Sequence, residues 1–356
     1  MTPTETLLRY LLETSPAHAV REIGSIDALR TEVTRLDLGG AFYAVGRRRG
    51  DLDALPEALT VDLRRQHARN TTQALRLQHE IGELRAHLEP PFVPLKGAAL
   101  LSHDVLPDPG QRTMLDLDLL TRRADRDRVV AGLESLGFRM DAFGGPPKHL
   151  PAFRRGPTML EVHEVAFWSP SGRRFGLEDF TAAAEPLAPT LVHLVHHALV
   201  SSVIEPSLVC KTLLDVARLL AVSSNPPALL ERASAIARAA NLASSLDAFA
   251  AAARALSSGA PLDGGARDIA ALCEPTTPAE ASWRYASFYL RALTGPPAWY
   301  RRETLASLLL PPRAAIEDAY GLRPGSPWAY PAYALRPVHL AVRGIQAFAS
   351  RRKGRA

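Results

Sequence analysis

Residues 95–120 decide the fold, and they read LKGAALLSHDVLPDPGQRTMLDLDLL. Near the end of this segment, residues 114–120 alternate acidic and apolar side chains, which predicts a β-strand whose side chains point to opposite faces in turn. Asp116 and Asp118 are separated by one residue, so we expect both carboxylates on the same face. The other face carries the leucines that we expect to pack behind the acids: Leu115, Leu117 and Leu119.

Two carboxylates held side by side repel each other, and this arrangement is costly unless a positive charge lies between them. Carboxylate oxygens, with the remaining positions left to water and substrate phosphate, are ligands that suit Mg²⁺. The alternative is that one acid is solvated at the end of the strand while the other caps the next helix, because so short a motif also occurs by chance. The flanking sequence favours the Mg²⁺ site.

Residues 93–99 precede the acids and read VPLKGAA, which indicates a short apolar strand, a glycine turn and the start of a helix. Backbone N–H groups at such a turn can bind phosphate, and Lys96 can add a positive charge there. The order of strand, glycine turn, helix and acidic strand is similar to that of nucleotidyltransferases of the DNA polymerase β type.

The same segment, followed by a helix that ends in LGF, resembles an uncharacterised nucleotidyltransferase family often found near peptide-maturation genes in bacteria. The family pattern has a Lys-Gly pair, a loop with Pro and Gly, an Arg ahead of the acids, and then Asp-x-Asp. These positions are Lys96, Gly97, Pro109, Gly110, Arg112, Asp116 and Asp118 here. The resemblance covers about residues 92–165 and implies an α+β fold, in which helices flank a polymerase β-like core with a small mixed sheet.

The resemblance also implies that Lys96, Gly97 and Arg112 bind the nucleotide. Members of the wider superfamily have a Ser after the glycine that holds a phosphate, whereas Ala98 stands at that position here. If a hydroxyl is needed there, Lys96, Arg112 or backbone amides must take its role.

Residues 158–165, TMLEVHEV, supply a candidate for a third acid. Alternation along a strand places Glu161 and His163 on one face and the apolar neighbours on the other. The family pattern at this strand is an acid, an apolar residue and a His, so the resemblance assigns the third acid to Glu161 and its companion to His163. The alternative is an ordinary edge strand whose polar side chains face water.

The resemblance implies a mechanism in which Asp116 and Asp118 bridge two Mg²⁺ ions, for which Mn²⁺ could substitute. Glu161 would complete the site for the ion that activates the attacking hydroxyl, as a ligand or as a general base. The donor substrate would be an NTP such as ATP.

Further basic side chains occur beyond the core motifs. Lys148 and His149 follow a Gly-Pro loop and could approach phosphate, although a solvated loop is the simpler expectation. His193, His196 and His197 fall at i, i+3 and i+4 of a predicted helix and therefore share one face. No acid accompanies them in an H-E-x-x-H arrangement, so we expect His193 and His197 to line the cleft rather than form a second metal site.

Helical periodicity dominates on both sides of the core. Thr4 is expected to cap a first helix, and residues 59–88 predict a longer one. We therefore expect an N-terminal helical region at 1–90, a catalytic core at 91–170 and a C-terminal all-helical domain with a basic tail at 171–356. In that last region, Asp215 is expected to pair with Lys211 one helical turn earlier.

Composition limits the class of protein. The chain has 356 residues, of which 47% are hydrophobic, enough for substantial cores in two or three domains. Its net charge of +5 is too small to indicate a nucleic-acid partner, although RNA is not excluded. Cys210 and Cys273 are far apart, which argues against a disulfide framework and a zinc ribbon. No secretory signal is recognised, and His residues interrupt the most apolar stretch, so we expect a cytoplasmic protein without a membrane span.

The sequence thus predicts a Mg²⁺-dependent nucleotidyltransferase that moves an NMP from an NTP to a hydroxyl-type acceptor and releases pyrophosphate. The acceptor stays open among a modified peptide, a small molecule, a protein side chain and an RNA end. Two alternatives remain: a catalytically silent relative that binds a nucleotide or a biosynthetic partner, and a toxin that nucleotidylates RNA.

Overall fold

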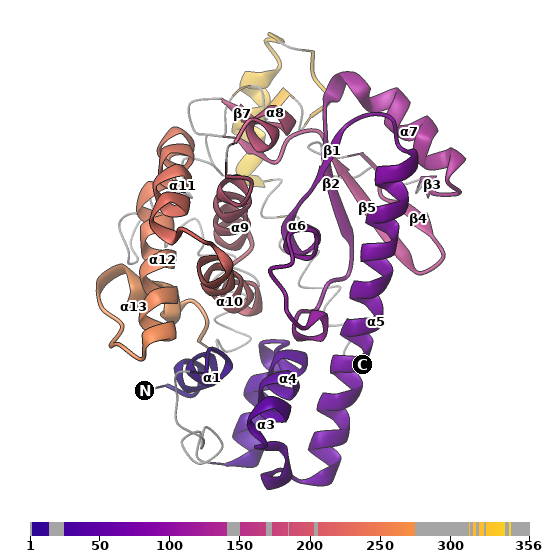
Figure 1. The fold of residues 1–356 in the computed structure, drawn as a ribbon. Helices are drawn as coiled ribbons and strands as arrows, with labels where there is room; N and C mark the ends of the chain where they lie inside the picture. Colours follow the sequence, from indigo (N-terminus) through magenta and orange to yellow (C-terminus); the bar gives the residue numbers. More distant parts are fainter. Residues whose placement is uncertain are drawn as a thin grey trace.

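The computed structural model describes residues 2–13, 25–140, 150–168, 173–183, 185–202 and 206–274, with residues 313, 316–317, 320–323, 325–338 and 342 near the C-terminus. Its described part is mainly helical and contains a five-stranded mixed sheet (Figure 1). This confirms the predicted α+β class. Lys148, His149 and the basic tail at 351–355 lie outside the described residues.

The described helices that precede the sheet gather mainly at one end of the molecule, and the last of them runs on along the sheet (Figure 1). They pack through apolar side chains that recur at helical spacing. They are α1 (Pro3–Leu11), α3 (Ile26–Arg35), α4 (Gly39–Arg49), the short 3₁₀ helix η1 (Leu52–Ala54) and α5 (Glu57–His87).

The first helix begins earlier than predicted. Thr2, rather than Thr4, caps α1: its side chain accepts a hydrogen bond from the backbone N–H of Glu5 at 3.2 Å. Pro3 occupies the first helical position, where a missing N–H costs nothing, and this moves the cap to Thr2. Thr4 is instead buried inside the helix and donates a hydrogen bond to Glu32 of α3.

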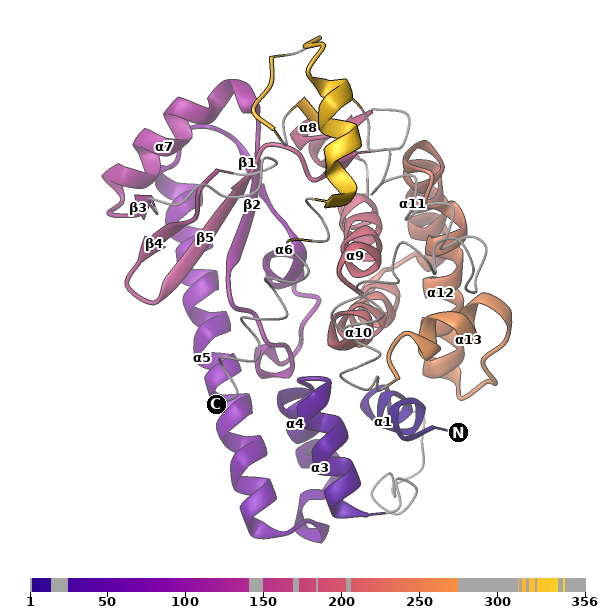
Figure 2. The same cartoon turned by 180° about the vertical axis from the view of Figure 1, so that it is seen from behind.

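Helix α5 joins the N-terminal helices to the sheet (Figures 1 and 2). It spans 31 residues, close to the predicted range. Its buried face includes Leu77, Ile81 and Leu84. Glu80 on this face forms an ion pair with Arg155 in the sheet. Both apolar packing and a partly buried charge pair therefore fix the helix against the sheet.

The sheet brings together strands that are far apart in the sequence. The strand order is β1-β2-β5-β4-β3, and only β2 and β5 among these neighbours run parallel. Their register pairs Asp118 with Glu161. The strands are β1 (Phe92–Pro94), β2 (Leu117–Thr121), β3 (Arg139–Met140), β4 (Phe153–Arg155) and β5 (Thr158–His163).

The acidic strand is shorter than predicted. It begins at Leu117 rather than at residue 114, and Leu115 is 73% exposed instead of packed behind the acids. The register explains this difference, because β5 pairs with β2 only from Leu117 onward and β1 pairs with it only from Leu119. A residue without a strand neighbour on either side has no sheet face to pack against.

Short helices connect the strands of the sheet. Helix α6 (Lys96–Ser102) follows β1, and the 3₁₀ helix η2 (Pro109–Gln111) leads toward β2. After β2 come η3 (Arg123–Asp125) and α7 (Arg126–Ser135). Gly137, predicted to end this helix, has φ of 84°, a conformation that favours glycine.

After the sheet, the described residues form helices and one pair of short antiparallel strands. Its elements are β6 (Phe167–Trp168), β7 (Arg174–Phe175), α8 (Leu177–Thr181), α9 (Leu187–Ser202), α10 (Pro206–Val222), α11 (Pro226–Ala240), α12 (Ala243–Ser258) and α13 (Gly264–Ala271).

One cluster of buried side chains extends from Leu7 to Cys273, so all three predicted regions contribute to the same core. Helix α9 packs against α6, and α1 packs against α10 and α12. The division into three domains stays a prediction. Among the described helices, none combines the length and the apolar character that crossing a bilayer requires.

Candidate active site

The parallel pairing of β2 with β5 places acidic side chains next to each other. Asp118 and Glu161 are paired in register, and His163 lies two residues further along β5. Ligand atoms of these three residues all lie within 4.8 Å of one another. As predicted, the alternate residues of β5, Leu160 and Val162, are completely buried behind them. The sheet therefore presents a compact group of oxygen and nitrogen ligands.

Lys96 and His163 both contact the same oxygen of Asp118. Lys96 Nζ donates to Asp118 Oδ1 at 2.7 Å, and His163 Nε2 lies 2.8 Å from that atom and 3.8 Å from Glu161 Oε2. Burial raises the pKa of Asp118, but the Lys96 ammonium and the contact with His163 outweigh burial and hold this pKa far below its usual value. Asp118 is therefore a carboxylate at neutral pH.

The backbone around Lys96 is unusual. Lys96 has φ of 51°, in the left-handed region that side chains other than Gly and Asn rarely adopt. A Cβ added to Gly97 would lie 2.4 Å from Arg112 Nη1 and 2.8 Å from Met114 Cγ. The Lys-Gly pair is thus explained by geometry, since the first residue turns the chain and only glycine leaves room for Arg112.

Asp116 lies immediately before β2 and is partly buried. Burial raises the pKa of Asp116. The negative charges of Asp118 and Glu161 raise it further, whereas Lys96 lowers it, and the resulting pKa is about 6. Asp116 therefore lies close enough to Asp118, Glu161 and Lys96 for their charges to affect it. Its carboxylate is, however, outside the group of ligand atoms that lie within 4.8 Å of one another.

Arg112 takes part in a buried network with helix α10. Its Nε donates to both carboxylate oxygens of Asp215, at 2.9 and 3.2 Å, and Asp215 is completely buried. Arg218 Nη1 lies 3.6 Å from the same carboxylate, and its Nη2 donates to Gln111 Oε1 at 2.9 Å. Arg112 therefore joins α10 to the segment that leads into β2.

This network corrects the predicted pairing of Asp215 with Lys211. Lys211 instead donates to Asp37, which follows α3, at 2.6 Å. A carboxylate in the core needs cations that are buried with it, and the arginines supply them whereas Lys211 extends to another neighbour. The signal that sequence reasoning missed is the position of Asp215 within an apolar run, between Leu214 and Val216, which predicts that the acid is buried and needs a buried cation.

His193 is buried behind the site rather than exposed in it. It is 3% exposed and lies in α9, with its ring near those of Phe167 at 6.1 Å and Phe180 at 6.2 Å. Burial lowers the pKa of His193, and the charges of His197 and Lys96 lower it further, so this imidazole is neutral. His193 and His197 have ring centroids 6.4 Å apart. Their predicted role in lining a cleft stays a proposal.

The donor set fits a divalent cation. Asp116, Asp118 and Glu161 place three carboxylates on or next to the paired strands β2 and β5, around the ammonium of Lys96. Burial is the main cause of the raised pKa of Asp116, and Asp118 and Glu161 raise it further. Carboxylate oxygens with one imidazole nearby suit Mg²⁺ or Mn²⁺ better than soft metals.

Comparison with known proteins gives the family to which the chain belongs. No curated protein sequence and no solved structure matches the chain significantly. A sequence model described as "Uncharacterised nucleotidyltransferase" matches residues 25–257, which include the N-terminal helices from α3 onward, the whole five-stranded sheet and most of α12. The chain therefore belongs to the uncharacterised nucleotidyltransferase family.

Proposed function

We propose that this protein transfers an NMP from an NTP to a hydroxyl-type acceptor, with release of pyrophosphate. Family membership supports the general class of reaction. The observation that carries the proposal is the register of β2 with β5, because it aligns Asp118 with Glu161 and leaves Asp116 beside them. Such a concentration of carboxylates has a physical purpose mainly around a cation.

Each residue has a role that follows from its contacts. Asp116, Asp118 and Glu161 would hold Mg²⁺ or Mn²⁺, and the bound ion would neutralise charge on the triphosphate and favour ionisation of the acceptor hydroxyl. His163 orients Asp118 through the contact at 2.8 Å. Lys96 balances the acids in the resting protein and carries a positive charge suited to the triphosphate.

The reaction balances without any other co-reactant. The acceptor oxygen forms a bond to the α-phosphorus, and the bond from that phosphorus to the bridging oxygen of the pyrophosphate breaks. Glu161 accepts the hydroxyl proton, and pyrophosphate leaves with the electron pair of the broken bond. Most of the rate would come from alignment and charge neutralisation, as in other phosphoryl-group transfers.

A silent relative that binds a nucleotide or a partner is the second candidate. The specific observation in its favour is that Asp118 Oδ1 already has two partners, Lys96 and His163. Ala98 in place of a serine adds to it.

Calorimetric titration with each NTP, with and without Mg²⁺, tests the nucleotide and metal site, and release of pyrophosphate from the bound NTP then separates a transferase from a silent relative. We expect Mg²⁺-dependent binding by the wild type and loss of that dependence in Asp116→Asn/Asp118→Asn. Asp53→Asn, an exposed acid in η1, is the matched control and should bind normally. Absence of binding at millimolar NTP with Mg²⁺ and with Mn²⁺ would contradict the transferase proposal.

A further inference from the structure

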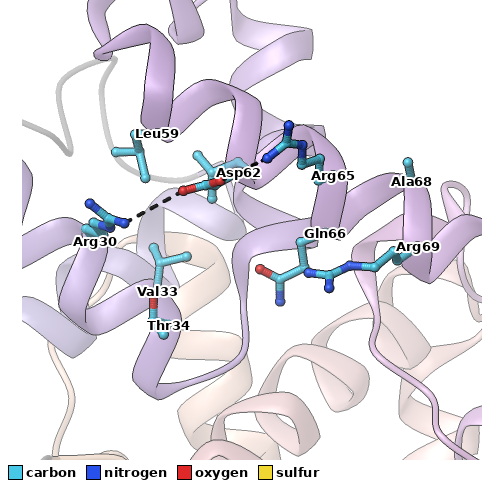
Figure 3. A pocket seen from close by; sticks show the side chains of 10 residues that line it. Arg30, Val33, Thr34, Leu59, Asp62, Arg65, Gln66, Ala68 and Arg69 are labelled. Atoms are coloured by element: carbon cyan, nitrogen blue, oxygen red, sulfur yellow. Dashed lines mark ion pairs between the residues drawn. The ribbon is translucent and has the colours of Figure 1, made fainter.

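A pocket of about 630 Å³ lies between α3 and α5 (Figure 3). The part of α5 that lines this pocket is the end next to α3, away from the sheet (Figure 1). Val33, Leu59 and Leu63 give it an apolar floor and are themselves buried. Charged and polar side chains surround this floor: Arg30, Asp62, Arg65, Gln66 and Arg69.

The rim has more positive than negative charge. Among the described residues that line the pocket, three arginines face one acid, Asp62. Asp62 lies between Arg30, at 3.7 Å, and Arg65, at 3.9 Å, as the dashed lines in Figure 3 show. Both distances exceed that of a direct hydrogen bond, and both arginines are more than half exposed. The pocket therefore keeps a surplus of about two positive charges.

The wall that faces the core is fixed. Gln66 donates from Nε2 to Asp37 Oδ1 at 2.8 Å, and Asp37 accepts a hydrogen bond from Lys211 of α10 at 2.6 Å. A side chain held in this way keeps its orientation before a ligand arrives, which lowers the entropic cost of binding. The flexible part of the pocket is the arginine rim.

Arginine recognises phosphate through paired N–H donors, and a pocket of this volume is of the size that holds small organic ligands. A surplus of two positive charges matches a phosphate monoester dianion. We propose that this pocket binds a phosphate monoester, with the phosphate at the arginine rim and an apolar organic part on the floor formed by Val33, Leu59 and Leu63.

The pocket is separate from the acidic cluster. Arg69 and Glu80, which pairs with the sheet, are about 16 Å apart along α5 at roughly 1.5 Å per residue. A ligand here would occupy a second site on the protein, and its binding needs neither the carboxylates nor Mg²⁺. Binding of a ligand at this pocket is therefore independent of the proposed transfer reaction.

The test is equilibrium binding of phenyl phosphate to the full-length protein in low salt without divalent metal. Inorganic phosphate and phenol are the comparison probes. We expect phenyl phosphate to bind about tenfold more tightly than inorganic phosphate, and phenol not to saturate. Affinities of the two phosphates within twofold of each other would overturn the assignment of the apolar floor.

Variants of exposed residues give effects of opposite sign. Arg69→Ala should weaken phenyl phosphate binding about tenfold, because a charged hydrogen-bond partner is lost. Asp62→Asn should strengthen binding, since it removes the acid that competes for Arg30 and Arg65. Arg64→Ala, on the same helix but outside the pocket, is the matched control and should leave the affinity unchanged.

Three results would overturn the proposal. The first is equal affinity of the wild type, Arg69→Ala and Asp62→Asn, and the second is the absence of saturable binding in the wild type. The third is loss of phenyl phosphate binding in Asp116→Asn/Asp118→Asn, which would place the probe at the acidic cluster instead. Retained binding in that double variant, with loss in Arg69→Ala, supports the pocket even if NTP binding fails.

Discussion

Asp118 and Asp215 are both aspartates that the fold removes almost completely from water, with exposed fractions of 2% and 0%. Asp215 faces two arginines, Arg112 at 2.9 Å and Arg218 at 3.6 Å. Its charge is therefore compensated inside the protein, and the group links α10 to the segment before β2. This is the pattern of a structural ion pair, in which cations and anion are buried together.

The surroundings of Asp118 differ from those of Asp215, because several acids lie near the same cation. Burial lowers the pKa of Lys96, but Asp118, Asp116 and Glu161 together raise it above its usual value. Three acids therefore lie around one lysine, while Asp215 is one acid beside two arginines. Burial of an acid alone thus does not distinguish a structural pair from a candidate site, whereas the ratio of acids to neighbouring cations does.

The difference between the two aspartates is tested most directly by neutralising Asp118. We expect Asp118→Asn to stay folded, because Asp116 and Glu161 continue to compensate Lys96. Transfer should fall about 10³-fold, since a ligand is lost where charge develops in the transition state. Release of pyrophosphate from an NTP measures the rate, and circular dichroism measures folding. Full activity in this variant would remove Asp118 from the proposed site.

Neutralising Asp215 should act on stability instead. In Asp215→Asn, Arg112 and Arg218 lose their buried counter-ion, so we expect the free energy of unfolding to fall by about 3 kcal/mol. Urea denaturation gives this value. A change below about 1 kcal/mol would mean that the network is not a stabilising ion pair.

A substitution in the turn beside the site is expected to lower the free energy of unfolding by a smaller amount. Gly97→Ala places a Cβ 2.4 Å from Arg112 Nη1, so Arg112 must move. We expect a loss of about 2 kcal/mol in unfolding free energy and weaker NTP binding, because the Lys96 turn shifts with it. Gly82→Ala, where the added Cβ meets nothing within 4 Å, is the matched control. Equal stability of the two variants would refute the steric explanation.

The smallest expected effect is a gain in stability. The pKa of Asp116 is raised to about 6, so its ionised form is disfavoured in the folded state and destabilises the protein above pH 6. Without divalent metal, Asp116→Asn should therefore raise the unfolding free energy at pH 7.5 by about 1–2 kcal/mol. The gain should shrink as pH falls through 6 toward 4, because the wild-type carboxyl then becomes protonated.

Urea denaturation at pH 7.5 and at pH 5 measures this difference. A gain that is the same at both pH values would show that ionisation of the Asp116 carboxyl is not its cause. Saturating Mg²⁺ should also reduce the gain at pH 7.5, because a bound cation stabilises the ionised wild-type cluster.

Local periodicity predicted the elements that carry the site. The alternation around Glu161, the helical spacing of α5 and the glycine at 137 are each determined by nearby residues, and all three are found in the structure. The family resemblance added the α+β class and the Lys-Gly turn. These features depend on short segments whose physical preferences are visible in sequence.

Contacts between distant segments could not be predicted in this way. Arg112 and Asp215 are 103 positions apart, and the expected partner Lys211 was simply the nearest one along the helix. Leu115 is exposed because strand β2 begins three residues later than the sequence pattern suggests. The arginine pocket between α3 and α5 depends on how two helices pack, so no single stretch of sequence indicates it.

The most direct test of the central claim is a titration of Mn²⁺ in the presence of ATP, followed by electron paramagnetic resonance. The wild type and Asp53→Asn should bind Mn²⁺ tightly, and both Asp118→Asn and Glu161→Gln should lose that binding while remaining folded. Equal Mn²⁺ affinity in all four proteins would contradict a metal-dependent site on the paired strands β2 and β5.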